Sequence, residues 1–220
     1  MATTRIRFIR ALVLCGLTLV MTALPAAAQQ VKRDVDYRVI PQQPVASGER
    51  IEVIDFFFYA CTYCNDLLPH LERWQKRSSG EIVFRHVPVV RHDSWVPLAK
   101  TYYTLEALGE AERLHSMVYR SYHIEELSMS QEQVIAEWAE KHGLDRERFM
   151  TIYRSDETRQ KIERARKMTM DYDIRGTPTI VVDGRYLTST SMTPSIPQVI
   201  PVLDSLVRIA RQQRLEKSGK

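Results

Sequence analysis

Two cysteines separated by two residues are the side chains in this sequence best suited to chemistry. Cys61 and Cys64 enclose Thr62 and Tyr63 and directly follow the apolar run 51–60. A cysteine at a strand-to-helix junction has its sulfur at the positive end of the helix dipole, near free backbone N–H groups, and both stabilise a thiolate. A stabilised thiolate is suited to thiol–disulfide exchange.

Exchange needs an exposed attacking sulfur and a second sulfur that resolves the mixed disulfide. We predict that Cys61 faces solvent at the helix N-terminus and is the nucleophile, and that Cys64, one turn later, is covered and is the resolving cysteine. Asp55 lies in the apolar run, where burial would raise its pKa and allow it to exchange a proton with Cys64. The alternative for Asp55 is a strand residue that faces solvent or forms a salt bridge.

The cysteine pair has two other interpretations, a zinc site and a structural disulfide. Zinc needs four ligands, and the chain has neither a second cysteine pair nor closely spaced histidines, so we expect no metal. A disulfide closing so short a loop constrains the unfolded chain little. The histidines are scattered and are predicted to lie on the surface or at helix ends: His70, His86, His92, His115, His123 and His142.

Thr177-Pro178 is the second feature with chemical meaning, because it forms a loop that enters an apolar segment. A cis bond there would turn the backbone of Thr177 towards a bound extended chain, which could then add main-chain hydrogen bonds. Sequence statistics alone favour a trans proline at a strand start. Tyr59 and Tyr63, next to the cysteines, are predicted to line an apolar patch that suits unfolded chains.

The surrounding elements are predicted as β-α-β, then helices, then β-β-α. Residues 51–58 are rich in β-branched and aromatic residues without strict alternation, which is typical of a strand buried on both faces. The other predicted elements are an edge strand at 37–40, a helix at 62–78, a strand at 82–90, five helices within 94–173, strands at 177–182 and 185–188 joined by Asp183-Gly184, and a helix at 195–211. The result is a mixed α/β sheet split by a helical insertion.

The first 28 residues have the layout of a secretory signal, with three arginines, a 14-residue apolar stretch at 11–24 and a small-residue cleavage site near Ala28. The stretch is shorter than the roughly 20 residues of a membrane-spanning helix, although an uncleaved anchor is the alternative. Cys15 would be removed with the signal. Export leads to an oxidising compartment, in which a disulfide persists.

The net charge of +4 comes mostly from the signal, because the remaining chain carries 28 basic and 27 acidic residues. This balance excludes nucleic acid as the expected partner. The basic end 208–220 is predicted to be a solvated helix end followed by a frayed tail rather than a membrane patch.

Several motifs together resemble the DsbA-like branch of the thioredoxin superfamily, over residues 37–206. They are Glu52-Val-Ile-Asp-Phe-Phe57, Cys61-x-x-Cys64, Val87-Pro-Val89, Tyr102-Tyr-Thr-Leu-Glu-Ala-Leu108 and Ile174-Arg-Gly-Thr-Pro-Thr-Ile-Val-Val-Asp-Gly184. The resemblance implies a thioredoxin fold with a helical insertion. The implied divisions are a signal peptide at 1–28, thioredoxin segments at 29–90 and 174–213, an insertion at 91–173 and a basic tail at 214–220.

The resemblance also implies a function: a periplasmic oxidoreductase that donates its disulfide to newly exported, reduced or unfolded proteins, with no cofactor. An inner-membrane, quinone-linked partner would reoxidise it. By position, Cys61, Cys64, Asp55 and a cis Pro178 match the family's functional residues, and Thr177 is compatible with them.

The dipeptide Thr62-Tyr63 differs from the Pro-His of the Cys-Pro-His-Cys motif in the strongly oxidising members of the family that this chain resembles. Without that histidine the thiolate is less stabilised, so the protein is expected to be a weaker oxidant. This leaves a disulfide isomerase or reductase open, although 29–50 is too short for the isomerases' dimerisation domain and we expect a monomer. A non-catalytic chaperone or peptide-binding module on the same fold and a glutathione-transferase-like protein are further alternatives, the latter disfavoured by the export signal.

Overall fold

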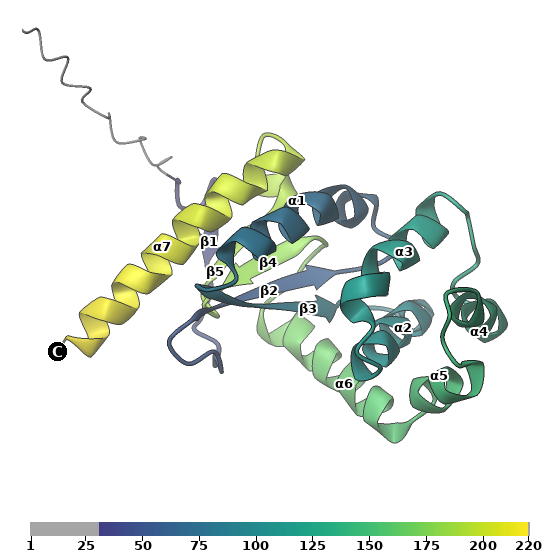
Figure 1. The fold of residues 1–220 in the computed structure, drawn as a ribbon. Coiled ribbons are helices and arrows are strands. Elements are labelled where there is room, and N and C mark those ends of the chain that lie inside the picture. The colour runs from purple at the N-terminus through teal and green to yellow at the C-terminus, as the bar shows by residue number, and fades with distance from the viewer. Residues whose placement is uncertain (1–30, 220) are drawn as a thin grey trace, which may run out of the picture.

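A single five-stranded mixed sheet forms the centre of the computed structural model, which describes residues 31–219 (Figure 1). The predicted signal and Cys15 lie outside the described residues. The strands are β1 (Arg38–Val39), β2 (Ile51–Phe57), β3 (Ile82–Pro88), β4 (Thr179–Val182) and β5 (Tyr186–Ser189). Their spatial order is β1-β5-β4-β2-β3. The predicted β-α-β … β-β-α arrangement is therefore confirmed.

Strand β2 is the central strand on which the rest of the sheet is built. It pairs in parallel with β3 and antiparallel with β4, and all seven of its residues are buried. Ile51 and Val53 pack on one face, whereas Ile54 and Phe56 pack on the other. A strand covered on both faces has no polar side, which explains why β2 lacks strict alternation in the sequence.

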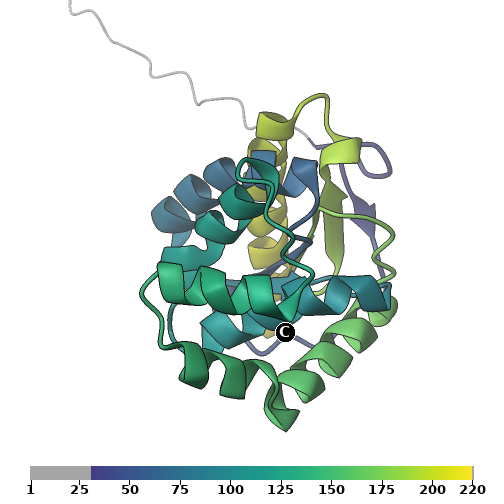
Figure 2. The same cartoon turned by 90° about the vertical axis from the view of Figure 1, so that its right-hand side faces the viewer.

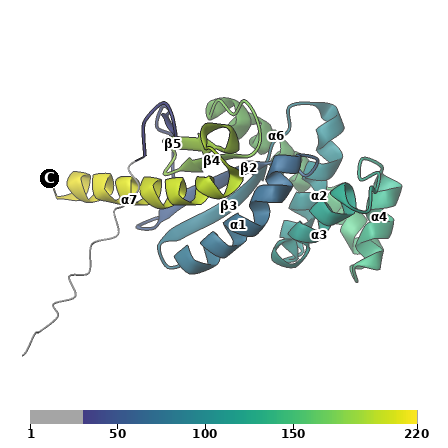
Figure 3. The ribbon, with the colours of Figure 1, turned by 90° about the horizontal axis from the view of Figure 1, so that it is seen from above.

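Helices cover both faces of the sheet. Helix α1 (Thr62–Ser78) and helix α7 (Val199–Ser218) pack on one face, where Trp74 and Leu203 belong to the same apolar cluster (Figures 1 and 3). Five helices lie between β3 and β4 in the chain and face the viewer in Figure 2. They are α2 (Val96–Ala107), α3 (Ala111–His123), α4 (Glu132–Lys141), α5 (Arg146–Tyr153) and α6 (Asp156–Asp171). Within residues 31–219, no helix is both long and apolar enough to cross a membrane.

The hairpin between β4 and β5 turns at Asp183 and Gly184, with φ values of 54° and 64°. Two successive positive φ angles are the mark of a type I′ turn, whose twist matches that of the strands. A Cβ atom on Gly184 would also lie 2.6 Å from the backbone oxygen of Gln43. Glycine is therefore required here by both conformation and space.

Helix α7 extends beyond the predicted end at residue 211, so the segment predicted as a basic tail, 214–220, is helical as far as Ser218. The helix continues to Ser218, and Arg214 is three-quarters buried. Its guanidinium donates to both carboxylate oxygens of Asp183 in the hairpin and, at 2.7 Å, to the carbonyl of Gly48. Arg214 therefore packs the end of α7 against the hairpin, because the fold places the carboxylate of Asp183 and the carbonyl of Gly48 within reach of its guanidinium.

We expect Arg214→Ala to lower the free energy of unfolding by about 1–3 kcal/mol, because it leaves the largely buried carboxylate of Asp183 without its partner. Urea denaturation measures this change. Arg211→Ala is the matched control: Arg211 pairs with Glu81 on the exposed surface, so its loss should cost less than about 1 kcal/mol. Equal effects of the two substitutions would contradict the role given to Arg214.

Candidate active site

Cys61 is the N-cap of α1, at the turn where β2 gives way to the helix. Its backbone N–H donates to the carbonyl of Phe58 at 3.0 Å, and its own carbonyl accepts from the N–H groups of Cys64 and Asn65, both at 3.1 Å. Both cysteines are free thiols, Cys61 partly exposed and Cys64 only 4% exposed. The sharp turn presents the first sulfur outward and carries the second beneath the helix.

The two sulfurs have opposite electrostatic environments. The hydrogen bond from the Cys64 thiol lowers the pKa of Cys61 most, and burial opposes it. The Thr177 side chain and the backbone N–H groups of Cys64 and Tyr63 lower this pKa further, to about 6 from an ordinary value of about 9. Burial raises the pKa of Cys64, and the neighbouring Cys61 and Asp55 raise it further. Cys61 is therefore a thiolate at neutral pH, while Cys64 stays a thiol that stabilises it.

The loop before β4 approaches the cysteines from a distant part of the chain. In its protonated form the Cys61 thiol donates to the carbonyl oxygen of Thr177, with Sγ and the oxygen 3.2 Å apart, and the Thr177-Pro178 peptide bond is cis. The carbonyl of Thr177 therefore faces the nucleophilic sulfur. The cis bond is the one that the family resemblance implied at Pro178. Arg91 donates to the carbonyl of Arg175 at 2.6 Å and attaches this loop to the end of β3.

A groove of about 600 Å³ runs beside this loop. It is lined by Arg38, Tyr63, Arg175, Gly176, Thr177, Pro178, Thr179, Leu187, Ser189, Thr190, Ser191 and Met192. Tyr63 is 61% exposed and its ring is available to a ligand. The groove thus combines backbone polar groups, hydroxyls and apolar side chains, which is the composition that an extended peptide segment requires.

Asp55 is buried in β2, directly opposite His86 in the register with β3. Its Oδ2 lies 3.0 Å from Nδ1 of His86, and its Oδ1 is buried with no hydrogen-bond partner among the described residues. Asp55 is also among the groups whose charge raises the pKa of Cys64. The acid is therefore both buried and paired with a histidine that the sequence did not single out.

Tyr59 does not line a surface patch, so that prediction is wrong. Only 1% of Tyr59 is exposed, and its hydroxyl lies 2.8 Å from Nδ1 of His115. Its carbonyl oxygen accepts from Nε2 of His123, also at 2.8 Å. The turn before Cys61 directs this ring inward, where α3 of the insertion covers it, while Tyr63 at the start of α1 points out.

The sequence analysis misplaced His86 and His115, which lie inside the fold near the site, whereas His123 is the last residue of α3 and thus the helix-end residue that was predicted. His115 is buried, and His86 and His123 are partly buried. His115 shares the apolar face of α3 with Leu114 and Val118, so the helical period of that segment was the signal that could have revealed its burial. No cluster of three or more His, Cys, Asp or Glu side chains within residues 31–219 could hold a metal ion.

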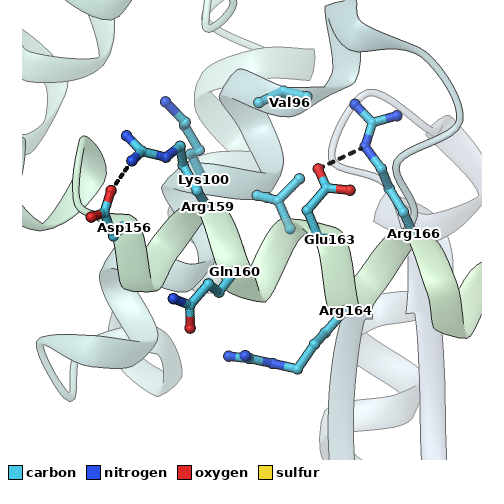
Figure 4. Close-up of a pocket in the computed structure, with 9 residues that line it drawn as sticks. Val96, Lys100, Asp156, Arg159, Gln160, Glu163, Arg164 and Arg166 are labelled. Atoms are coloured by element: carbon cyan, nitrogen blue, oxygen red, sulfur yellow. Dashed lines mark ion pairs between the residues drawn. The ribbon is translucent and has the colours of Figure 1, made fainter.

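A second hollow, of about 750 Å³, lies between α2 and α6 on the insertion (Figure 4). Its charged side chains pair with one another: Arg159 contacts Asp156, and Arg166 lies 3.6 Å from Glu163. Because this lining contains no nucleophile and most of its charges are paired, the cysteine site has the stronger claim to chemistry.

Two sequence comparisons, one with a family model and one with individual proteins, identify the same protein family. The family model of a DSBA-like thioredoxin domain matches residues 93–198. The thiol:disulfide interchange protein DsbA of Burkholderia cepacia is 32% identical over 200 residues, covering 91% of this chain and 92% of that protein. The protein of the same name from Bordetella parapertussis is 31% identical over 201 residues, covering 90% and 96%.

Solved structures of DsbA proteins share the fold of this chain. The oxidoreductase DsbA of Xylella fastidiosa superposes with a TM-score of 0.74 at 28% identity, covering 80% of this chain and 96% of that one. Pseudomonas aeruginosa DsbA has the same fold, with a TM-score of 0.80 at 24% identity over 84% and 96% of the chains. A thioredoxin fold with a Cys-x-x-Cys pair at the start of α1 defines a thiol:disulfide oxidoreductase. This chain belongs to the DsbA family, as its motifs had indicated.

We expect Cys64→Ala to raise the pKa of Cys61 in the reduced protein, because it removes the hydrogen bond that lowers this pKa most. The wild-type thiolate forms as pH rises through about 6 and is lost below it. The thiolate's ultraviolet absorbance, followed against pH, measures the change. Cys64→Ser is the control, since its hydroxyl can still donate. Identical titrations of Cys64→Ala and Cys64→Ser would contradict the assigned cause.

Proposed function

We propose that this protein is a periplasmic thiol:disulfide oxidoreductase that donates the Cys61–Cys64 disulfide to newly exported proteins. One feature supports this most strongly: a partly exposed Cys61, whose pKa is lowered to about 6, begins the helix turn that contains a buried Cys64 with a raised pKa. The predicted secretory signal supports the compartment, and the names of the relatives support the exchange reaction.

The reaction follows from this asymmetry. In the oxidised protein, a substrate thiolate attacks the Cys61 sulfur, the S–S bond breaks, and Cys64 leaves and takes up a proton. A second substrate thiolate then attacks the substrate sulfur of the mixed disulfide, so the substrate gains a disulfide and Cys61 leaves as a thiolate. A low-pKa leaving thiol leaves faster, and the stabilised Cys61 thiolate therefore drives the transfer towards the oxidised substrate.

The groove beside the cis-proline loop is the proposed substrate-binding site. The backbone of Thr177 and Pro178 would pair with an extended segment of an unfolded chain, and the exposed ring of Tyr63 would contact its apolar side chains. The lining of the groove includes two charged side chains, Arg38 and Arg175. Tyr59 is excluded from this role by its burial.

The reduced protein must be reoxidised before it acts again. We propose that an inner-membrane, quinone-linked partner accepts the two electrons, and that the protein acts as a monomer. We propose that Asp55 exchanges a proton with Cys64, whose sulfur leaves when the substrate is oxidised and attacks when the protein is reoxidised. Its burial near Cys64 supports this role.

Isomerase or reductase activity is the second candidate, favoured by one specific observation. The residues between the cysteines, Thr62 and Tyr63, supply no positive charge beside the thiolate. The lowered pKa of Cys61 arises from neutral hydrogen-bond donors instead. The reduction potential of the Cys61–Cys64 pair therefore decides between a disulfide donor and an isomerase or reductase.

Substitution of each cysteine separates their roles. We expect Cys61→Ser to abolish disulfide exchange. We expect Cys64→Ala to accumulate mixed disulfides with a disulfide-bonded peptide, because the Cys61 thiolate attacks the peptide disulfide, one peptide thiolate leaves, and no second sulfur can release the adduct. Non-reducing electrophoresis and mass spectrometry detect the adducts. Undiminished exchange by Cys61→Ser would refute the assignment. Unchanged binding of unfolded protein by the double-cysteine variant, with no thiol turnover in the wild type, would favour a non-catalytic chaperone.

The equilibrium reduction potential of the Cys61–Cys64 pair in glutathione buffers tests the direction of transfer. We expect a value more oxidising than about −180 mV, that of protein disulfide isomerase, as a disulfide donor requires. A value near about −270 mV, that of thioredoxin, would identify a reductase or an isomerase kept reduced. Below about −300 mV the bridge would be structural.

A further inference from the structure

We propose that His123, the last residue of α3, is a positioning residue for disulfide exchange: it fixes the peptide group that follows Tyr59, and thereby the direction in which the Cys61 sulfur points. The inference rests on the proposed function above and extends it to the helical insertion, which in this way sets the reduction potential of the cysteine pair. His123 acts through the backbone of Tyr59 and not on a sulfur.

Residues 58–61 form the turn that carries the chain from β2 into α1. The backbone N–H of Cys61 donates to the carbonyl of Phe58 at 3.0 Å, which is the hydrogen bond that closes a four-residue β-turn. Tyr59 and Ala60 are its central residues, and the peptide group between them is its central peptide. Because Cys61 is also the N-cap of α1, the geometry of this turn determines how the first cysteine enters the helix.

The central peptide of a β-turn can take two orientations, which distinguish type I from type II. A type II turn needs a positive φ at its third residue, which here is Ala60. Among the described non-glycine residues, positive φ is confined to Asp34, Glu126, Asp173 and Asp183. The turn is therefore not of type II, and a glycine at position 60 would remove the steric barrier to that alternative.

His123 holds the central peptide from the side of the insertion. Its Nε2 donates to the carbonyl oxygen of Tyr59 at 2.8 Å, and because a carbonyl oxygen only accepts, Nε2 carries the hydrogen. Only 1% of Tyr59 is exposed, so water has no ready access to replace this donor. A buried carbonyl without a donor is costly, and loss of His123 therefore favours a rotated peptide that directs the oxygen elsewhere.

The side chain of Tyr59 is held by the same helix. His115, Tyr119 and His123 recur every four residues and lie on one side of α3. The Nδ1 of His115 lies 2.8 Å from the hydroxyl of Tyr59, and the rings of Tyr119 and Tyr59 meet edge to face with centroids 4.9 Å apart. Tyr119 also stacks on His123, with an interplanar angle of 16°. Both ends of Tyr59 are thus attached to one helix of the insertion.

The orientation of the turn matters to the sulfur because the contacts that stabilise the thiolate are directional. The Cys61 thiolate accepts from the Cys64 thiol and from the backbone N–H groups of Cys64 and Tyr63. Hydrogen bonds weaken steeply when their angles are distorted. A rotated turn would move Sγ away from these donors, make the thiolate less stable and make the oxidised protein a weaker disulfide donor.

The test compares two substitutions at position 123. His123→Leu removes the donor, so it should raise the pKa of Cys61 above its value of about 6 and lower the exchange rate at neutral pH about tenfold. It should also lower the equilibrium constant with glutathione about tenfold, which is about 30 mV towards a more reducing potential. His123→Gln keeps an N–H donor and should restore all three values, which would exclude a charge on the imidazole as the cause.

Ser121→Ala is the matched control on the same helix. The Ser121 hydroxyl accepts from Nε1 of Trp138 at 2.9 Å, a buried contact between α3 and α4. Its loss should lower the free energy of unfolding but leave the pKa of Cys61 and the reduction potential at their wild-type values. If His123→Leu likewise changes only the free energy of unfolding, or if His123→Gln restores nothing, His123 is a structural contact and the proposal is overturned.

A glycine at position 60 tests the rotation of the peptide group itself. Ala60→Gly permits a positive φ, so it should change the pKa of Cys61 little while His123 holds the carbonyl of Tyr59. Combined with His123→Leu, it should raise this pKa by more than the sum of the two single changes. Strictly additive changes would overturn rotation of the turn as the mechanism.

One measurement needs no substitution. A histidine N–H that is held by a buried carbonyl exchanges slowly with solvent, so NMR spectra of the wild-type protein should show the Nε2 proton of His123 close to Tyr59. Absence of this proton would overturn the proposal. The pKa of Cys61 is measured on the reduced protein without substrate, so a wild type that shows no exchange but gives the expected pKa changes would refute the proposed function and leave the role of His123 standing.

Discussion

The hydrogen bond from the buried Cys64 thiol to the Cys61 sulfur is the interaction on which the rest of the site depends. It stabilises a thiolate at the start of α1 only because Cys64 is held neutral, and burial under the helix is what keeps it neutral. The fold therefore stabilises the reduced pair by placing two chemically identical groups in unlike surroundings. A short spacing along one helix is enough to produce that difference, since one turn separates the solvent-facing end from the core.

The insertion contributes to the site although it supplies no reacting atom. Helix α3 holds the turn before Cys61 through two histidines, His115 at the hydroxyl of Tyr59 and His123 at its carbonyl. The aromatic ring of Phe57 packs against both Tyr59 and His115. The position of the nucleophile is thus fixed by the contact between the thioredoxin core and the insertion, and substitutions in α3 can affect the chemistry without touching a sulfur.

The sheet and the cis-proline loop bring together residues that are far apart in the chain. Thr177 is 116 positions from Cys61, yet its carbonyl accepts from the thiol. The order β1-β5-β4-β2-β3 makes this possible, because β4 lies beside β2 and the loop before β4 ends next to the turn after β2. The five insertion helices can lie between β3 and β4 in the chain because they leave this pairing intact.

By itself the sequence determined the elements and the reactive pair: helix α1 from Thr62 to Ser78, the hairpin at Asp183-Gly184, and the Cys61/Cys64 spacing are local features set by backbone preference and periodicity. Only the tertiary structure decided what those residues touch. Tyr59 turned inward, His86 met Asp55 across two strands, and Arg214 reached Asp183, because burial and pairing depend on elements distant in the chain. Local patterns carry no information about such partners.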